Sequence, residues 1–169
     1  ISEDPHLSRS FVLIGGTAIN LFDKEIPRLS VDIDLDYVQR GKSFDVSIIE
    51  GHLDLLSRIG ASVGLKAYDR RRADERSSEK LRMIFEFESN FSRDTGTVKL
   101  DIGYLMKTTV FPLRRVTMKQ LTRYDGFAGL QFPIADLCEL WAGKAVALVY
   151  KTSKDPRPSE VSDLYSMQI

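Results

Sequence analysis

Residues 11–37 have the sequence FVLIGGTAINLFDKEIPRLSVDIDLDY, and this stretch decides the fold. The hydrophobic pattern predicts a short strand over 11–14, a turn at Gly15-Gly16, a short helix over 17–22 and a second strand over 31–37. The N-terminus of the predicted helix therefore falls at the two glycines.

The second predicted strand carries two carboxylates on one face. Side chains two residues apart on a strand point the same way, so Asp32 and Asp34 lie on the same side. The apolar residues Val31, Ile33 and Leu35 then face a core. The side that carries the aspartates is a place for a cation.

A third carboxylate, Asp101, lies on a later strand. The alternation of apolar and polar residues predicts strands over 81–88 and 97–104, which flank a turn and form an antiparallel pair. Asp36 shares the face of Asp32, but it stands roughly 13 Å farther along the strand, too far to bind the same ion. We therefore leave Asp36 out of the predicted metal site.

These features together favour phosphoryl transfer. Magnesium prefers oxygen ligands and keeps some water, so two or three aspartates are enough to hold it. A glycine turn at a helix start lets backbone amides approach phosphate oxygens, and Thr17 adds a hydroxyl. An Asp-x-Asp pair or a Gly-Gly pair alone is more often a solvated face or a plain turn. The order of the three features favours the site.

The remaining pattern is mostly helical. In chain order it predicts a helix ending at Gly60, an extended piece over 65–68, an exposed loop over the charged residues 69–80, a helix from Pro133 to about Lys151 and a last helix near 159–168. We expect a core over 1–130 and an incomplete helical C-terminal segment over 131–169. Because the chain opens on Ile1 rather than Met, we also expect it to be a piece of a longer polypeptide.

Composition excludes several classes of protein. The chain has 169 residues and 43% hydrophobic content, enough for one domain with a core. Its 24 basic and 24 acidic residues give no overall field that would attract nucleic acid or an anionic membrane.

The single Cys138, expected in the core, forms no internal disulfide, and His6 and His52 lack zinc-site spacing. Without a signal pattern or an apolar run of about 20 residues, we expect a cytoplasmic protein and no membrane partner.

Two blocks of sequence resemble a known family. Residues 14–21 (IGGTAINL) and 28–35 (RLSVDIDL), followed by 99–102 (KLDI), are similar to the AbiEii-like nucleotidyltransferases. These are toxins of type IV toxin–antitoxin systems within the DNA polymerase β-like superfamily. The resemblance implies an α/β (α+β) nucleotidyltransferase fold, with a mixed twisted sheet flanked by helices and a helical C-terminal part.

The resemblance also implies roles for individual residues. Asp32, Asp34 and Asp101 would hold Mg²⁺, or alternatively Mn²⁺, while Gly15, Gly16, Thr17 and Ser30 would lie at the phosphates of a nucleoside triphosphate. Lys144 would reach toward the triphosphate, and Asp163 would belong to an arginine and aspartate motif that begins at Arg157. The spacing of that last motif is longer here than in the family pattern.

Helix geometry gives separate support for Lys144. On a helix Lys144 falls within an apolar stripe formed by Leu137, Trp141 and Leu148, and a buried lysine needs an anion unless its stem carries the charge out to water. We favour a phosphate partner. Asp163 falls opposite the apolar stripe of its own predicted helix, so its catalytic role rests on the resemblance alone.

The resemblance predicts transfer of a nucleotidyl group from a nucleoside triphosphate to an acceptor hydroxyl, on tRNA, by a toxin that a cognate antitoxin restrains. The arginines at 70–72, with Arg114, Arg115, Lys119 and Arg123, would contact an RNA backbone or would simply be solvated surface. Two alternatives stay open. The acceptor could be a small molecule such as an aminoglycoside, or a protein side chain. The chain could also be a nucleotide-binding module without turnover.

Overall fold

The computed structural model describes residues 7–22, 32–38, 46–74, 77–89, 94–104, 109–117 and 131–154. Its elements, in chain order, are α1 (Leu7–Ser10), β1 (Phe11–Ile14), α2 (Gly15–Phe22), β2 (Ile33–Tyr37), α3 (Val46–Ser62), β3 (Lys66–Asp74), β4 (Ser77–Glu88), β5 (Thr95–Gly103), β6 (Arg114–Thr117), β7 (Gln131–Ile134) and α4 (Leu137–Lys154). The predicted order of strand, glycine turn, helix and strand over 11–37 is confirmed.

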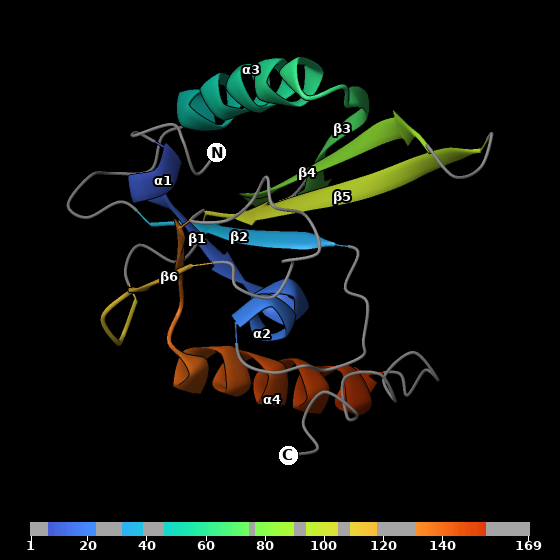
Figure 1. Ribbon diagram of the computed structural model, residues 1–169. Coiled ribbons are helices and arrows are strands. Elements are labelled where there is room, and N and C mark those ends of the chain that lie inside the picture. Colours follow the sequence, from blue (N-terminus) through green and yellow to red (C-terminus); the bar gives the residue numbers. More distant parts are fainter. Residues whose placement is uncertain are drawn as a thin grey trace.

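The strands form a mixed seven-stranded sheet in the order β3-β4-β5-β2-β1-β7-β6. β2 runs parallel to β5 and β1 runs parallel to β7, while the other neighbours are antiparallel. In Figure 1, α3 lies on one side of the sheet, and α2 and α4 lie on the other. The fold is the predicted α/β arrangement of a mixed sheet flanked by helices.

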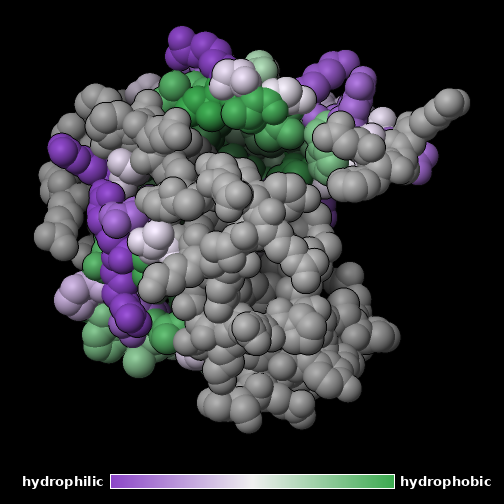
Figure 2. Space-filling view, in the orientation of Figure 1, coloured by the Kyte–Doolittle hydropathy of each residue, from purple (hydrophilic) through white to green (hydrophobic). Residues whose placement is uncertain are grey.

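One face of the sheet is apolar and packs beneath α3. Leu35 in β2 pairs with Leu13 in β1 and with Ile102 in β5, and all three side chains are buried. His52 of α3 stacks among aromatic rings at the end of this core and hydrogen-bonds the Tyr104 hydroxyl, 3.0 Å away. Figure 2 shows hydrophobic surface gathered at α3 and hydrophilic surface at its margins.

The opposite face of β2, β5 and β4 is polar. Because side chains alternate along a strand, the register places Asp34 of β2, Asp101 of β5 and Arg82 of β4 in one row across this face. α2 and α4 touch each other beside that row. The polar row and the two helices define the candidate site.

The prediction of a loop over 69–80 is wrong. Residues up to Asp74 continue β3, and β4 begins at Ser77, so the charged residues pair backbone to backbone across a hairpin. β3 is the edge strand of the sheet, a position where charged residues are common because they discourage pairing with other chains. Hydrogen bonding to β4 outweighs the low strand propensity of these residues.

The prediction of a helix from Pro133 is also wrong at its start. Residues 131–134 form β7, whose Ile134 pairs with Leu13, so the sheet extends past residue 130. α4 begins at Leu137 because Asp136 caps it, accepting a hydrogen bond from the Cys138 amide at 2.9 Å. Cys138 is exposed, which corrects the expectation that it lies in the core.

Three further predicted features can be placed. The predicted helix ending near Gly60 corresponds to α3, and the extended piece over 65–68 corresponds to the start of β3. The last predicted helix lies outside the described residues. Of the helices described, none combines the length and apolar character needed to cross a membrane.

Candidate active site

The glycine turn and the aspartate strand are in direct contact. Gly15 has φ +72°, a left-handed conformation that favours glycine, and it starts α2 directly after β1. A Cβ added at Gly15 would lie 2.2 Å from Oδ2 of Asp34. The missing side chain therefore lets a carboxylate lie against the backbone of the turn.

Thr17 ties the same turn to the start of the aspartate strand. Its hydroxyl donates a hydrogen bond to the backbone carbonyl of Asp32. A hydroxyl has one proton, so in this arrangement Thr17 cannot also donate to a phosphate oxygen. Thr17 therefore acts in this structure as a link between the turn and the start of the aspartate strand.

Two of the three predicted carboxylates are direct neighbours across the sheet. Asp34 pairs with Asp101 in the parallel β2–β5 register, which puts both side chains on one face. Burial raises the pKa of Asp34, and the nearby charges of Asp101 and Asp32 raise it further. Lys144 and Arg82 act in the opposite direction. Asp101 and Asp32 therefore both lie within electrostatic reach of Asp34.

Arg82 forms a strong ion pair that the sequence did not reveal. Its Nε and Nη2 donate to the two carboxylate oxygens of Asp101 at 2.7 and 2.6 Å. On the same face, the Lys99 ammonium lies 3.9 Å from a carboxylate oxygen of Asp32. The register between β4 and β5 brings Arg82 to Asp101, and that register is a long-range feature that local patterns do not specify.

The donor set fits magnesium better than a metal held by protein groups alone. Within the described ranges, no group of three or more His, Cys, Asp or Glu side chains is arranged to hold a metal ion. Magnesium is commonly bound by one or two carboxylates together with water and substrate phosphates. Asp34 and Asp101 offer such carboxylates, and a divalent cation would relieve the repulsion that raises the pKa of Asp34.

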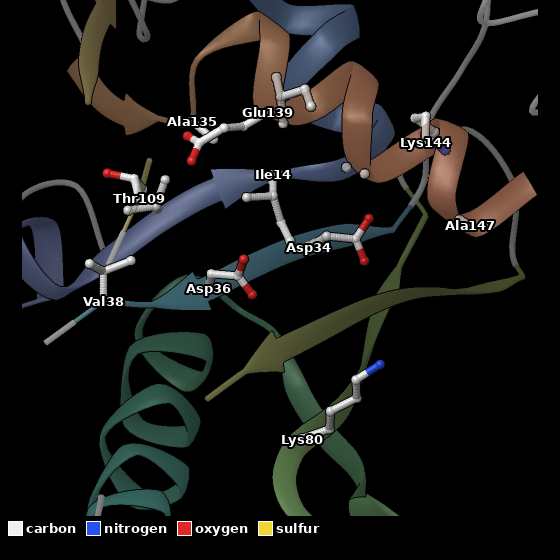
Figure 3. A pocket seen from close by; sticks show the side chains of 14 residues that line it. Ile14, Asp34, Asp36, Val38, Lys80, Thr109, Ala135, Glu139, Lys144 and Ala147 are labelled. Atoms are coloured by element: carbon white, nitrogen blue, oxygen red, sulfur yellow. The ribbon is translucent and has the colours of Figure 1, made fainter. Parts of the chain in front are cut away.

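A cavity of about 460 Å³ lies between the polar face and α4. Gly15, Asp34 and Lys144 line it, together with Asp36 and Glu139, and Figure 3 shows Asp34 and Asp36 side by side on β2 with Lys144 on the facing helix. Lys144 is half-buried, as its position in the apolar stripe predicted. The cavity is large enough to hold part of a nucleotide.

Asp36 also lines this cavity, although the sequence analysis excluded it from the metal site. Burial raises the pKa of Asp36 to about 6, with further contributions from Asp34 and Glu139, while Lys80 lowers it. The alternation along the strand correctly placed Asp36 on the face of Asp34. Its neighbours in the cavity come from distant parts of the chain and could not be predicted.

The other predicted site residues can be placed only in part. Gly16 is half-buried in the first turn of α2. Ser30, Arg157 and Asp163 lie outside the described residues.

Comparison with known proteins gives a family and a fold. The family model described as "Nucleotidyl transferase AbiEii toxin, Type IV TA system" matches residues 2–167. JHP933 from Helicobacter pylori is similar over 82% of this chain and 49% of its own, with 20% identity and a TM-score of 0.52. MenT4, a nucleotidyltransferase toxin from Mycobacterium tuberculosis H37Rv, is similar over 82% and 44%, with 14% identity and a TM-score of 0.57.

The chain therefore spans about half the length of these solved structures. No curated protein sequence matches it. At these identities the similarity to solved structures concerns the fold alone.

Proposed function

This chain belongs to the family of AbiEii nucleotidyltransferase toxins of type IV toxin–antitoxin systems, and from that premise we propose that it transfers a nucleotidyl group from a nucleoside triphosphate to an acceptor hydroxyl. The observation that carries the proposal is the pairing of Asp34 with Asp101 on adjacent strands. Both the glycine turn and Lys144 line the cavity into which Asp34 projects.

The metal ligands would be Asp34 and Asp101, which pair across the sheet, with Mg²⁺ or Mn²⁺ as the cation. Asp32 would join them as a third ligand, although the described side chains do not form a ready-made group of three. A bound cation supplies neutralisation of the triphosphate charge and alignment of the attacking and leaving oxygens. The proximity of the carboxylates, which raises the pKa of Asp34, supports this assignment.

The protein groups would divide the remaining work. Backbone amides at Gly15 and Gly16 face the phosphates from the N-terminal end of α2, and the Lys144 ammonium balances their charge. Asp101 accepts the proton of the acceptor hydroxyl as its oxygen bonds to the α-phosphorus and the bond to pyrophosphate breaks. Arg82 must release at least one oxygen of Asp101 for this step, because it now holds both. Roles for Ser30 and Asp163 rest on family resemblance.

We propose tRNA as the acceptor and a cognate protein as the antitoxin, in the cytoplasm. The polar face beside Asp101 carries three basic side chains, Lys80 and Arg82 on β4 and Lys99 on β5. Phosphate groups of a nucleic acid are natural partners for such a cluster.

A transfer assay tests this function. The protein is incubated with each α-labelled nucleoside triphosphate, Mg²⁺ or Mn²⁺, and total RNA, and label in RNA is measured before and after RNase treatment. We expect RNase-sensitive label that EDTA and the substitution Asp34→Asn abolish. Asp54→Asn, an equivalent change at an exposed position of α3, should retain full transfer. Undiminished transfer by Asp34→Asn would refute the site.

A further inference from the structure

The cavity beside α4 has two chemically different ends. In Figure 3, Lys144 and Ala147 lie at one end, while Thr109, Glu139 and Val38 lie at the other. Of the groups proposed for the phosphates and the metal, Gly15, Asp34 and Lys144 line this cavity. The second end has no role in the transfer chemistry.

Glu139 is the first indication of a ligand at this second end. One of its carboxylate oxygens, Oε1, accepts a hydrogen bond from the Val110 amide. The other, Oε2, is buried and has no hydrogen-bond partner among the described residues. Nearly all buried polar atoms in proteins have a partner, because leaving one unsatisfied is costly. A ligand in the cavity that donates a hydrogen bond would satisfy this oxygen once a rotation of the Glu139 side chain exposes it.

Asp36 is the second indication. It lies two residues after Asp34 on the same face of β2, about 7 Å farther along the strand, and lines the same cavity as Glu139. Ionised carboxylates are acceptors only, so together these two groups select donors. The cavity is also lined by Thr109 and Lys80 and by the apolar side chains of Val12, Val38 and Leu140.

The distance from the phosphate end decides which part of a nucleotide would reach them. In a nucleoside triphosphate the ribose is attached directly to the α-phosphate, and the base lies beyond it. Asp36 lies two residues, or about 7 Å, beyond Asp34 on the strand, so its carboxylate would lie beside the sugar rather than beside the phosphates. The ribose carries two hydroxyl donors on one edge, which matches two acceptors that approach from different elements, β2 and α4.

We propose that the second end of this cavity is a ribose subsite, in which Asp36 and Glu139 accept hydrogen bonds from the sugar hydroxyls and thereby select ribonucleotides over 2′-deoxyribonucleotides. This inference rests on the proposed function, because it presumes a nucleotide whose phosphates lie at Gly15 and Lys144.

Calorimetric binding of matched triphosphates tests the ribose subsite. Each ribonucleoside triphosphate and its 2′-deoxy counterpart are titrated into the protein with Mg²⁺. A hydrogen bond to a charged acceptor is typically worth 10- to 100-fold in affinity, so we expect the ribose form to bind roughly 10- to 100-fold more tightly. Equal affinity for the two forms would overturn the subsite and leave the transferase proposal standing.

Variants give a second readout that a purely structural role would not produce. Replacing the acceptor of the 2′-hydroxyl, by Glu139→Gln or by Asp36→Asn, should reduce the preference for ribose by about tenfold and leave the affinity for the 2′-deoxy form unchanged. The other variant should weaken both forms, because both keep the 3′-hydroxyl. Lys144→Met should weaken both forms equally, because it acts on the phosphates. A ribose preference that neither Glu139→Gln nor Asp36→Asn reduces would contradict the assignment. Failure of every triphosphate to bind the wild-type protein would instead overturn the proposed function and the subsite together.

Discussion

Replacing Gly15 by alanine tests how closely the glycine turn and the aspartate strand depend on each other. With φ +72°, Gly15 has a conformation that costs an L-residue about 1–2 kcal/mol. The new Cβ would lie 2.2 Å from Oδ2 of Asp34 and 2.9 Å from its Cβ. Since the Cβ of Asp34 is fixed to the backbone of β2, rotation of the side chain cannot relieve the clash.

The expected cost follows from these two contributions. Overpacking of this kind typically adds about 1–3 kcal/mol, so Gly15→Ala should lower the free energy of unfolding by about 2–5 kcal/mol. The shift of Asp34 away from Asp101 should also reduce transfer by about 100-fold, the usual consequence of a catalytic group misplaced by about 1 Å. Urea unfolding and the labelled transfer assay measure the two effects on the same protein.

Gly51 provides a matched control for the same substitution. It lies on the exposed side of α3, and no described atom lies within 4 Å of a Cβ added there. Gly51→Ala should therefore raise stability by about 0.5–1 kcal/mol and leave transfer unchanged. The proposed contact between the turn and Asp34 would be refuted if Gly15→Ala behaved like Gly51→Ala in both assays.

Two other predictions concern the acidic and basic groups of the polar face. Asp36 has a pKa of about 6 in the folded protein against an ordinary 3.8. The folded state is therefore most stable relative to the unfolded chain below pH 4, where Asp36 is neutral in both, and it loses stability as the pH rises through 6 and the buried carboxyl ionises. Asp36→Asn should raise the free energy of unfolding by up to about 3 kcal/mol at pH 8 and change it little at pH 4, as urea titrations in EDTA would measure; equal effects at both pH values would contradict the burial of its charge. Arg82→Gln removes the positive charge that competes for both oxygens of Asp101, so Mn²⁺ should bind roughly tenfold more tightly by calorimetry. Weaker Mn²⁺ binding would show instead that Arg82 positions Asp101 for the cation.

Features that depend on neighbouring residues could be predicted from the sequence. The alternation in 31–37 places Asp34 on the polar face, and the periodicity of α4 places Lys144 in a half-buried stripe. The glycine pair marks the start of α2 because φ at Gly15 is one that other residues rarely adopt. Each of these inferences needs only a few residues in one element.

Features that depend on strand register could not be predicted in the same way. The pairing of Asp34 with Asp101 joins residues that are 67 positions apart in the sequence, and Arg82 reaches Asp101 only because β4 and β5 pair in one particular register. The charged residues 69–74 form a strand because β4 offers them a hydrogen-bonding edge, which their own composition does not reveal. Pro133 lies in β7 for a similar reason, since β1 and β6 flank it on both sides.

The charges on β2 are difficult to explain by stability alone. Asp34 and Asp36 are both half-buried on one strand, and burial raises the pKa of each. Asp34 raises the pKa of Asp36 further, whereas asparagine at either position would keep the shape without a buried charge. A fold selected only for stability gains nothing from such a row of carboxylates beside a cavity. A site that binds a cation next to Asp34 and sugar hydroxyls next to Asp36 gives each charge a partner. The stability that the free protein loses by half-burying these carboxylates is then recovered when a nucleotide and its metal bind.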